Sequence, residues 1–322
     1  MPDQNLKDLA YRTTASVFGG PVDLATMVMR PFGYKTTDQQ VVGGSEWIGK
    51  KLEDVGLISS ARSPITEFLT SMAVPTPGGI AKGAAMAAPM VGGMFVGKGS
   101  KTWDALAADK AKIMADMGTD ARTIWKETGT WKGPDGKWRQ EISDKPAEIT
   151  DDVYAGIKEK QRFEGPMQQA LSHPQLYEAY PDTGKIQSGM YAWRTPEGSY
   201  HSATDTITVG GPGTTSQKSA SLHELQHAIQ GREGFAQGGS PNDPALMPYV
   251  RKFYVNNIDQ FQGEGHELLN MAKQRAYQNL AGEAEARATQ ARMNMTPEQR
   301  RATFPEESYD VPLNQLIIQG LK

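Results

Sequence analysis

The spacing of hydrophobic and polar positions divides the chain into two parts. In residues 1–118, apolar positions recur at helical spacing only in short stretches, which Gly-Gly and proline-containing breakers separate. The pattern predicts short helices at residues 5–18, 21–29, 46–55 and 64–72. The repeated glycine breaks favour a segment that wraps around or links other elements over one compact bundle.

From residue 103 onward the pattern is typical of a mixed α+β domain. Residues 130–142 carry aromatic positions on both sides of a Pro-Asp-Gly turn at 134–136, which predicts a β-hairpin. Ile207 and Val209 alternate with polar neighbours and predict a strand. Together the elements predict an α+β fold class that is mainly helical with a small antiparallel sheet. The other expected elements are helices at 104–117, 121–128, 150–161, 167–180 with an interruption at 172–174, 216–230 and 267–293, and extended stretches at 188–193 and 202–209.

The predicted helix at 216–230 carries the most informative motif of the chain, H-E-x-x-H at His223, Glu224 and His227. At about 100° per residue, the two imidazoles project within about 40° of each other. One face can therefore present two metal ligands while the opposite face packs on a core. Glu224 is placed to accept a proton from a water molecule that the metal activates. The apolar residues of the opposite face are Leu222, Leu225 and Ile229.

A catalytic zinc ion needs a third protein ligand and an open coordination position. No histidine follows His227 at the spacing that would supply this ligand. The other histidines, His173, His201 and His266, stand at a helix break, at a strand start and after a glycine, where surface or capping roles are expected. A carboxylate is therefore expected to complete the site.

The predicted helix at 267–293 offers two carboxylates, Glu283 and Glu285. Glu283 continues an apolar stripe of this helix, whereas Glu285 faces the other way, so we assign Glu283 as the third ligand and keep Glu285 as the alternative. An ion pair between Glu283 and Arg287, one turn on, is the interpretation without a metal. Gly282 would allow close approach of another backbone. The stripe consists of Leu269, Ala272, Ala276 and Leu280.

Composition limits the chemistry that the chain can perform. The 322 residues include no cysteine and five histidines, which excludes disulfides, iron–sulfur clusters and thiol catalysis. A net charge of −3 and a pI of about 6.0 predict no specific nucleic-acid binding. Residues 68–103 contain no Asp or Glu, and Met86, Met90 and Met94 recur there at helical spacing. Packing or partner contact is favoured for this stretch, with membrane contact through 68–103 as the alternative.

Two runs of sequence carry a resemblance to a known family. SLHELQHAIQGREGFAQGG and LAGEAEAR resemble the zincin-like metallopeptidase domain found in large polyvalent proteins of bacteriophages and conjugative elements. GTWKGPDGKWRQEISD and LSHPQLYEAYP are similar to the segment that precedes this motif, so the resemblance spans about residues 121–292. It implies a Zn²⁺ cofactor, a protein or peptide substrate, His223 and His227 as ligands and Glu224 as general base. It supports Glu283 and Glu285 equally as the third ligand.

The N-terminal part has a resemblance of its own. GGPVDLATMVMRPFG and VGGSEWIGKKLEDVG are similar to a segment of internal or DNA-ejection proteins of tailed phages. This resemblance implies a protein of the virion interior that is delivered into the host cell, with portal, core or tail proteins as partners. Outside the virion the expected localisation is cytoplasmic.

These observations lead to a domain division and to competing functions. We expect a helical, Gly- and Met-rich region for virion association or partner binding at 1–118, a zincin-like metallopeptidase domain at 119–300 and a C-terminal tail at 301–322. The first hypothesis is a phage-encoded zinc-dependent metallopeptidase, in which the strand ending at Val209 aligns an extended substrate. The alternative is a structural internal virion or DNA-ejection protein whose H-E-x-x-H domain is a scaffold or is dispensable for assembly. Candidates for stabilising the reacting oxyanion are Tyr277, His266 and Arg287.

Overall fold

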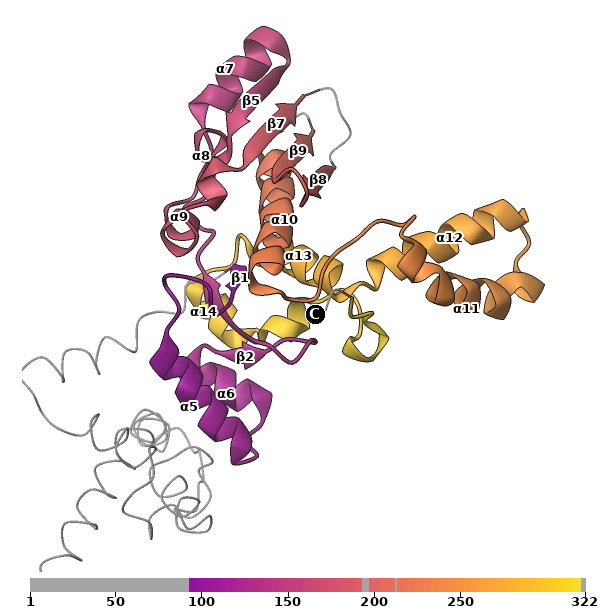
Figure 1. Cartoon of the computed structure of the whole chain (residues 1–322), viewed down its shortest axis with the longest axis horizontal. Coiled ribbons are helices and arrows are strands. Elements are labelled where there is room, and N and C mark those ends of the chain that lie inside the picture. The colour runs from indigo at the N-terminus through magenta and orange to yellow at the C-terminus, as the bar shows by residue number, and fades with distance from the viewer. Residues whose placement is uncertain (1–92, 193–196, 212, 320–322) are drawn as a thin grey trace, which may run out of the picture. The chain divides into compact units, whose positions relative to one another are not determined.

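The computed structural model describes residues 93–192, 197–211 and 213–319, which belong to a compact unit formed by Pro89–Lys322. The helices predicted between residues 5 and 72, and most of the acid-free stretch, lie outside the described residues. Within the described residues, the predicted α+β fold class is confirmed (Figure 1). The helices are α5 (Ala105–Asp116), α6 (Ala121–Thr128), α7 (Asp151–Lys160), α8 (Met167–Ala170), α9 (Pro174–Ala179), α10 (Thr214–Glu233), α11 (Met247–Asn257), α12 (Gly265–Gln278), α13 (Ala281–Arg292) and α14 (Pro297–Ala302).

Within the described ranges, three small sheets accompany the helices. One is three-stranded and antiparallel in the order β1-β3-β2, and another pairs β4 with β6. The largest is four-stranded in the order β5-β7-β9-β8, with a parallel pair β7-β9 and antiparallel pairs at both edges. The strands are β1 (Met94–Val96), β2 (Trp131–Lys132), β3 (Trp138–Ile142), β4 (Glu148–Ile149), β5 (Arg162–Pro166), β6 (Leu171–Ser172), β7 (Gln187–Tyr191), β8 (Gly198–His201) and β9 (Thr206–Gly210).

The predicted hairpin is confirmed as β2 and β3, which pair Trp131 with Arg139. Its turn is closed by hydrogen bonds from Gly133 N–H to the Lys137 carbonyl, 2.9 Å, and from Gly136 N–H to the Gly133 carbonyl, 2.9 Å. Gly136 has a φ of 76°, a conformation that favours glycine and explains the residue at this position. The turn therefore sets the register of β3, in which Arg139 lies opposite Trp131.

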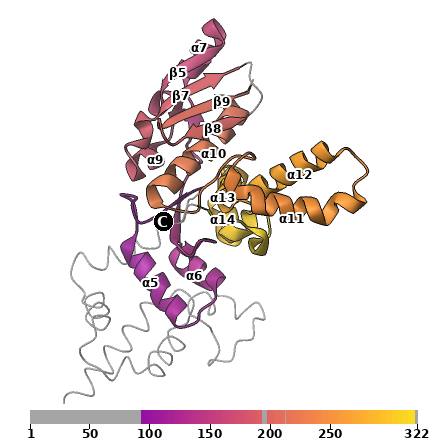
Figure 2. The same ribbon diagram turned by 45° about the vertical axis from the view of Figure 1, so that its right-hand side comes forward.

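Helix α10 lies between the four-stranded sheet and α13 (Figures 1 and 2). Its apolar side packs as predicted, because Leu222, Leu225 and Ile229 are fully buried in the largest core cluster, beside Ile207 and Val209 of β9. The side chains of the two motif histidines are 13% and 14% exposed, and they lie on the side of α10 that meets α13. The packing of α10 therefore turns its metal-binding face toward α13.

The prediction of one continuous helix over 267–293 is wrong. α12 ends at Gln278, and α13 begins at Ala281. The break is held by a bridge with the C-terminal segment, in which Ile317 N–H donates to the Asn279 carbonyl at 2.7 Å and Ala281 N–H donates to the Ile317 carbonyl at 2.8 Å. The apolar stripe of α12 therefore does not continue into α13, and the position of Glu283 does not follow from that stripe.

Other differences concern short elements. Residues 202–209 are not one strand, since β9 begins at Thr206, and β9 has neighbours on both sides in the sheet. Met94 belongs to strand β1, which pairs with β3, so its predicted helical spacing with Met86 and Met90 does not hold for this residue. Residues 247–257 form α11, which the hydrophobic pattern did not predict. α11 and α12 lie side by side as a helical hairpin (Figure 1).

The expected boundary between residues 118 and 119 falls between α5 and α6, which contact each other. After residue 300, Phe304 and Ile317 are buried in two separate core clusters. Among the helices of the described residues, none is both long enough and apolar enough to cross a membrane.

Candidate metal centre

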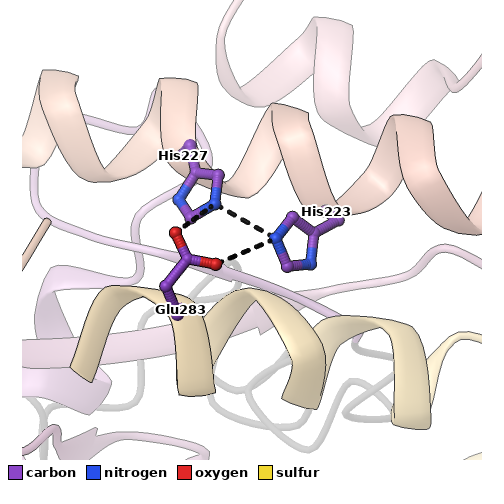
Figure 3. A group of neighbouring side chains, drawn as sticks. All are labelled: His223, His227 and Glu283. Carbon is purple, nitrogen blue, oxygen red and sulfur yellow. Dashed lines mark hydrogen bonds and ion pairs between the residues drawn. The ribbon is translucent and has the colours of Figure 1, made fainter. Parts of the chain in front are cut away.

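Two imidazoles from α10 and one carboxylate from α13 converge in the structure (Figure 3). The Nε2 atoms of His223 and His227 are 3.1 Å apart. Each Nε2 atom is 3.4 Å from an oxygen of Glu283, His223 from Oε2 and His227 from Oε1. Two ligand atoms at about 2.0–2.1 Å from a tetrahedral zinc ion are about 3.3–3.4 Å apart. The observed separations are close to this value, and the two 3.4 Å distances end on different oxygens of Glu283. The three side chains are therefore near enough to supply three ligands to one zinc ion.

Glutamine side chains hold the far nitrogen of each imidazole. His223 Nδ1 is 3.1 Å from Gln290 Oε1, and His227 Nδ1 is 2.9 Å from Gln230 Oε1. Exchange of the oxygen and nitrogen of either glutamine amide would remove another hydrogen bond. Gln290 Nε2 donates to Ser219, and Gln230 Nε2 donates to the Gly282 carbonyl at 2.8 Å. Each Nδ1 must then carry the proton, which leaves the Nε2 lone pair for a metal.

The Glu283 carboxylate is buried, with only 2% of its side chain exposed. Its Oε1 accepts a hydrogen bond from Gly239 N–H at 3.0 Å, while its Oε2 has no hydrogen-bond partner. Burial alone would raise the pKa of Glu283, but His223 and His227 beside it lower the pKa well below its usual value. Burial likewise would lower the pKa of His227, but the Glu283 carboxylate raises it to about 9. The arrangement therefore favours a cation between these groups, either a proton or a metal ion.

Glu224 lies beside this cluster, at the contact between α10 and the edge strand β8. It is 5% exposed, and a Cβ atom added at Gly198 of β8 would lie 2.4 Å from its Oε1. Burial raises the pKa of Glu224, while His227 and His223 oppose the shift. A carboxylate whose proton affinity is raised above that of an exposed glutamate is suited to general-base chemistry near neutral pH.

The loop after α10 closes over the site, and two glycines permit it. A Cβ atom at Gly238 would lie 2.4 Å from both Glu283 Oε1 and His227 Cε1. A Cβ atom at Gly282 would lie 2.2 Å from Gly238 N and from the carbonyl carbon of Gln237. The predicted close approach of a backbone at Gly282 is confirmed.

A comparison with protein families bears on the segment that precedes this site. A family model described as Large polyvalent protein associated domain 23 matches residues 93–150. The match fits the large polyvalent protein context of phages and mobile elements that the sequence resemblance implied. It ends before the H-E-x-x-H helix, so the zincin-like part of the resemblance stays a prediction. The search of curated proteins gave no match, and neither did the search of solved structures.

The matched segment contacts the α10 motif through β1. Gln226, inside the H-E-x-x-H sequence, accepts from Phe95 N–H at 3.0 Å and donates to the Phe95 carbonyl at 3.0 Å. It also donates to Glu285 Oε1 at 3.1 Å. Glu285 itself pairs with Arg139 of β3, Nε to Oε2 at 2.6 Å. Of the two glutamates considered as the third ligand, Glu283 therefore lies beside the imidazoles and Glu285 does not; the role of Glu283 as a ligand stays a prediction.

The remaining histidines lie outside the cluster. His173 is fully buried, which corrects the expected surface position, but it does cap a helix: its Nδ1 accepts from Leu176 N–H at 3.2 Å and its Nε2 is 2.9 Å from Asp144 Oδ1. His201 ends β8 and is exposed, and His266 is exposed and 3.0 Å from Glu264.

Among the residues considered for oxyanion stabilisation, Tyr277 is the one whose pKa responds to Glu283. Burial raises the pKa of Tyr277, and the neighbouring Glu283 carboxylate raises it further. Arg287 instead pairs with Asp310, Nε to Oδ2 at 2.7 Å, which also removes the predicted alternative in which Arg287 pairs with Glu283. Because its pKa is raised, the phenol of Tyr277 stays protonated at neutral pH and can donate a hydrogen bond.

Sequence reasoning missed the polar residues that support the ligands, namely Gln226, Gln230, Gln290 and Arg139. Glutamine and arginine are common on protein surfaces, so neither residue type marks a buried support. One local feature could have indicated a support: Gln230 follows His227 by three residues on the same helix, a spacing that brings side chains together.

Proposed function

We propose that the described unit is a zinc-dependent hydrolase of peptide bonds, with His223, His227 and Glu283 as metal ligands and Glu224 as general base. The observation that carries this proposal is the convergence of two imidazoles and one carboxylate beside the buried Glu224. The two Nε2 atoms are 3.1 Å apart, and each is 3.4 Å from a different oxygen of Glu283. The unpartnered Glu283 Oε2 and the fixed Nδ1 protons support it, because they leave three acceptors facing one position.

A zinc ion, when bound, supplies a Lewis acid that polarises a carbonyl group and lowers the pKa of water. Glu224 takes the proton of the attacking water and transfers it to the departing amine nitrogen, because its raised pKa suits both directions of transfer. Tyr277 remains a phenol at neutral pH, so it can donate a hydrogen bond to the oxygen on which negative charge develops.

For substrate alignment we propose β8 in place of the strand that ends at Val209. β9 is paired with β7 and with β8, whereas β8 lies at the edge of the sheet and contacts α10. An extended peptide that adds to β8 would run past Gly198, against which the Glu224 carboxylate packs. The small size of Gly198 would leave room for this carboxylate beside the peptide.

Two measurements on the purified full chain test the enzyme proposal. We expect one zinc ion per chain by mass spectrometry of metals, and its loss in His223→Ala. We expect Glu224→Gln to keep the zinc and to lose at least about a hundredfold in hydrolysis of an unstructured protein substrate. Absence of stoichiometric zinc, or unchanged proteolysis in Glu224→Gln, would contradict the proposal.

We also propose that the chain travels inside a virion and acts after delivery into the host cell, with portal, core or tail proteins as partners. The match to a polyvalent-protein domain supports a mobile-element context for this idea. Mass spectrometry of purified particles should find the chain at fixed copy number, and its absence from particles would exclude the structural alternative. If His223→Ala particles assemble normally but lose infectivity, the metal centre serves delivery or a later step; normal infectivity would instead favour the scaffold role.

A further inference from the structure

A buried arginine in the matched segment lies at the centre of a charged network behind the metal site. Arg139 of β3 has no exposed side-chain surface. Its Nε donates to Glu285 at 2.6 Å, and its two terminal nitrogens donate to the two oxygens of Asp135 at 2.7 and 3.0 Å. The guanidinium carbon lies 3.8 Å from the centre of the Phe235 ring. A planar, five-donor group is needed to engage two carboxylates and a ring at the same time, which a lysine cannot do.

One route leads from Arg139 to the metal ligand His227. Glu285, held by Arg139, accepts a hydrogen bond from Gln230 Nε2 at 3.3 Å through its other oxygen. Gln230 Nε2 also donates to the Gly282 carbonyl, so both of its protons are engaged. Its oxygen is then directed at His227 Nδ1, 2.9 Å away. The position of Glu285 thus contributes to the ring orientation of His227.

A second route leads to the carboxylate ligand. Asp135, which Arg139 engages, accepts a hydrogen bond from Ala236 N–H at 2.8 Å, and Lys137 of the same hairpin donates to the Gly234 carbonyl. These contacts fix the loop after α10, which also carries Phe235. The same loop supplies the Gly239 N–H that donates to Glu283 Oε1 at 3.0 Å.

We propose that Arg139 is a positioning residue for the metal centre, which orients His227 through Glu285 and Gln230 and holds the loop over Glu283 through Asp135. This inference rests on the proposed function. It gives the segment matched by the polyvalent-protein domain a role in the zinc site, although that segment contributes no ligand. Residues that orient metal ligands from behind typically change metal affinity about 10–100-fold when they are altered.

The other imidazole provides an internal reference. His223 is held by Gln290, whose amide donates to the Ser219 carbonyl at 3.2 Å and to its hydroxyl at 2.9 Å. Among the described contacts, no hydrogen bond connects Gln290 or Ser219 to Arg139 or to its carboxylate partners. A change at Arg139 should therefore alter the hydrogen bond at His227 Nδ1 and leave the hydrogen bond between His223 Nδ1 and Gln290 unchanged.

The test compares Arg139→Lys with a matched control, Arg292→Lys. Arg292 is also a fully buried arginine, lies on α13 and pairs with Glu141 of β3 at 2.7 Å. Among the described residues, its side chain forms hydrogen bonds and ion pairs with Glu141, Thr303 and Ser308, and these residues do not hold a ligand. Zinc affinity is measured on the full chain by competition with a chelator. The imidazole Nδ1–H resonances of the zinc-loaded protein are followed by proton NMR.

For Arg139→Lys we expect zinc affinity to fall about 10–100-fold and the Nδ1–H proton of His227 to exchange faster with water, with the His223 proton unchanged. For Arg292→Lys we expect zinc affinity within about threefold of the wild type. If Arg139→Lys does not fold, Glu285→Gln, which removes the charge that Arg139 engages, should show the same pair of changes.

The possible failures are distinguishable. Wild-type zinc affinity in Arg139→Lys, or an equal loss in Arg292→Lys, would overturn the positioning role and leave the proposed function intact. A wild-type chain that binds no zinc would overturn both.

Discussion

Replacement of Gly282 by alanine tests the close approach on which the site depends. The added Cβ would lie 2.2 Å from Gly238 N and 2.5 Å from the Gln237 carbonyl oxygen, and these neighbours are backbone atoms. Ordinary contact begins near 3.4 Å, so the loop would have to move by about 1.2 Å. Such a shift lengthens the 3.0 Å hydrogen bond from Gly239 N–H to the Glu283 carboxylate beyond useful range.

The expected change in the free energy of unfolding combines one stabilising and two destabilising effects. Alanine in place of glycine inside a helix contributes about 1 kcal/mol of stability through helix propensity. Overpacking against the loop costs about 1–3 kcal/mol. Loss of a hydrogen bond to a charged carboxylate costs about 1.5–3 kcal/mol more. We therefore expect Gly282→Ala to lower the free energy of unfolding by roughly 1.5–5 kcal/mol.

The assay is urea unfolding of the zinc-free chain, followed by circular dichroism, with Gly231→Ala as the matched control. Gly231 is an exposed glycine of α10, and a Cβ atom there would meet no atom within 4 Å. This control should gain up to about 1 kcal/mol, because only helix propensity changes. If Gly282→Ala proves as stable as the wild type, the loop does not lie against α13 as described and the reasoning fails.

Two further predictions separate the neighbouring groups of the site. Glu283→Gln should abolish stoichiometric zinc binding measured by metal analysis. Glu285→Ala should instead lower the free energy of unfolding by about 1.5–3 kcal/mol, because it removes one of the two carboxylates that engage the buried Arg139. Equal zinc loss at full stability in Glu285→Ala would contradict this division. In the zinc-free chain, the pKa of His227 rises from 6.5 to about 9, so its interaction with Glu283 stabilises the fold fully below about pH 6.5 and is lost as the pH rises through 9. Urea unfolding between about pH 6 and pH 9 should show this decline, and His227→Gln should flatten it.

The local features of the site could be predicted from the sequence. The four-residue spacing of His223 and His227, together with the apolar residues Leu222, Leu225 and Ile229, indicates which side of α10 is buried, and that relation needs no tertiary information. The hairpin could be predicted for the same reason, since Pro134, Asp135 and Gly136 specify a turn by themselves.

The break between α12 and α13 could not be predicted in this way. Residues 267–293 contain no proline, and the interruption at Asn279 and Leu280 is stabilised by pairing with Ile317, nearly forty residues further on. Glu283 still reaches the imidazoles because α13 is placed by its own contacts, with Gly282 against the loop after α10. Glu283 therefore lies beside the histidines as predicted, but the apolar stripe on which that prediction rested does not place it there.

The positions of the H-E-x-x-H sequence each meet a different neighbour, and this explains why the site extends beyond the motif. His223 and His227 form hydrogen bonds with glutamine side chains, and Glu224 packs against the edge strand β8. Leu225 enters the main core, while Gln226 bonds both backbone groups of Phe95 in β1. Strand β1 thus belongs to the structural setting of the motif, although it lies more than a hundred residues earlier. A boundary placed by a change in sequence composition cannot detect such a contact, because one backbone pair and one glutamine leave no periodic pattern.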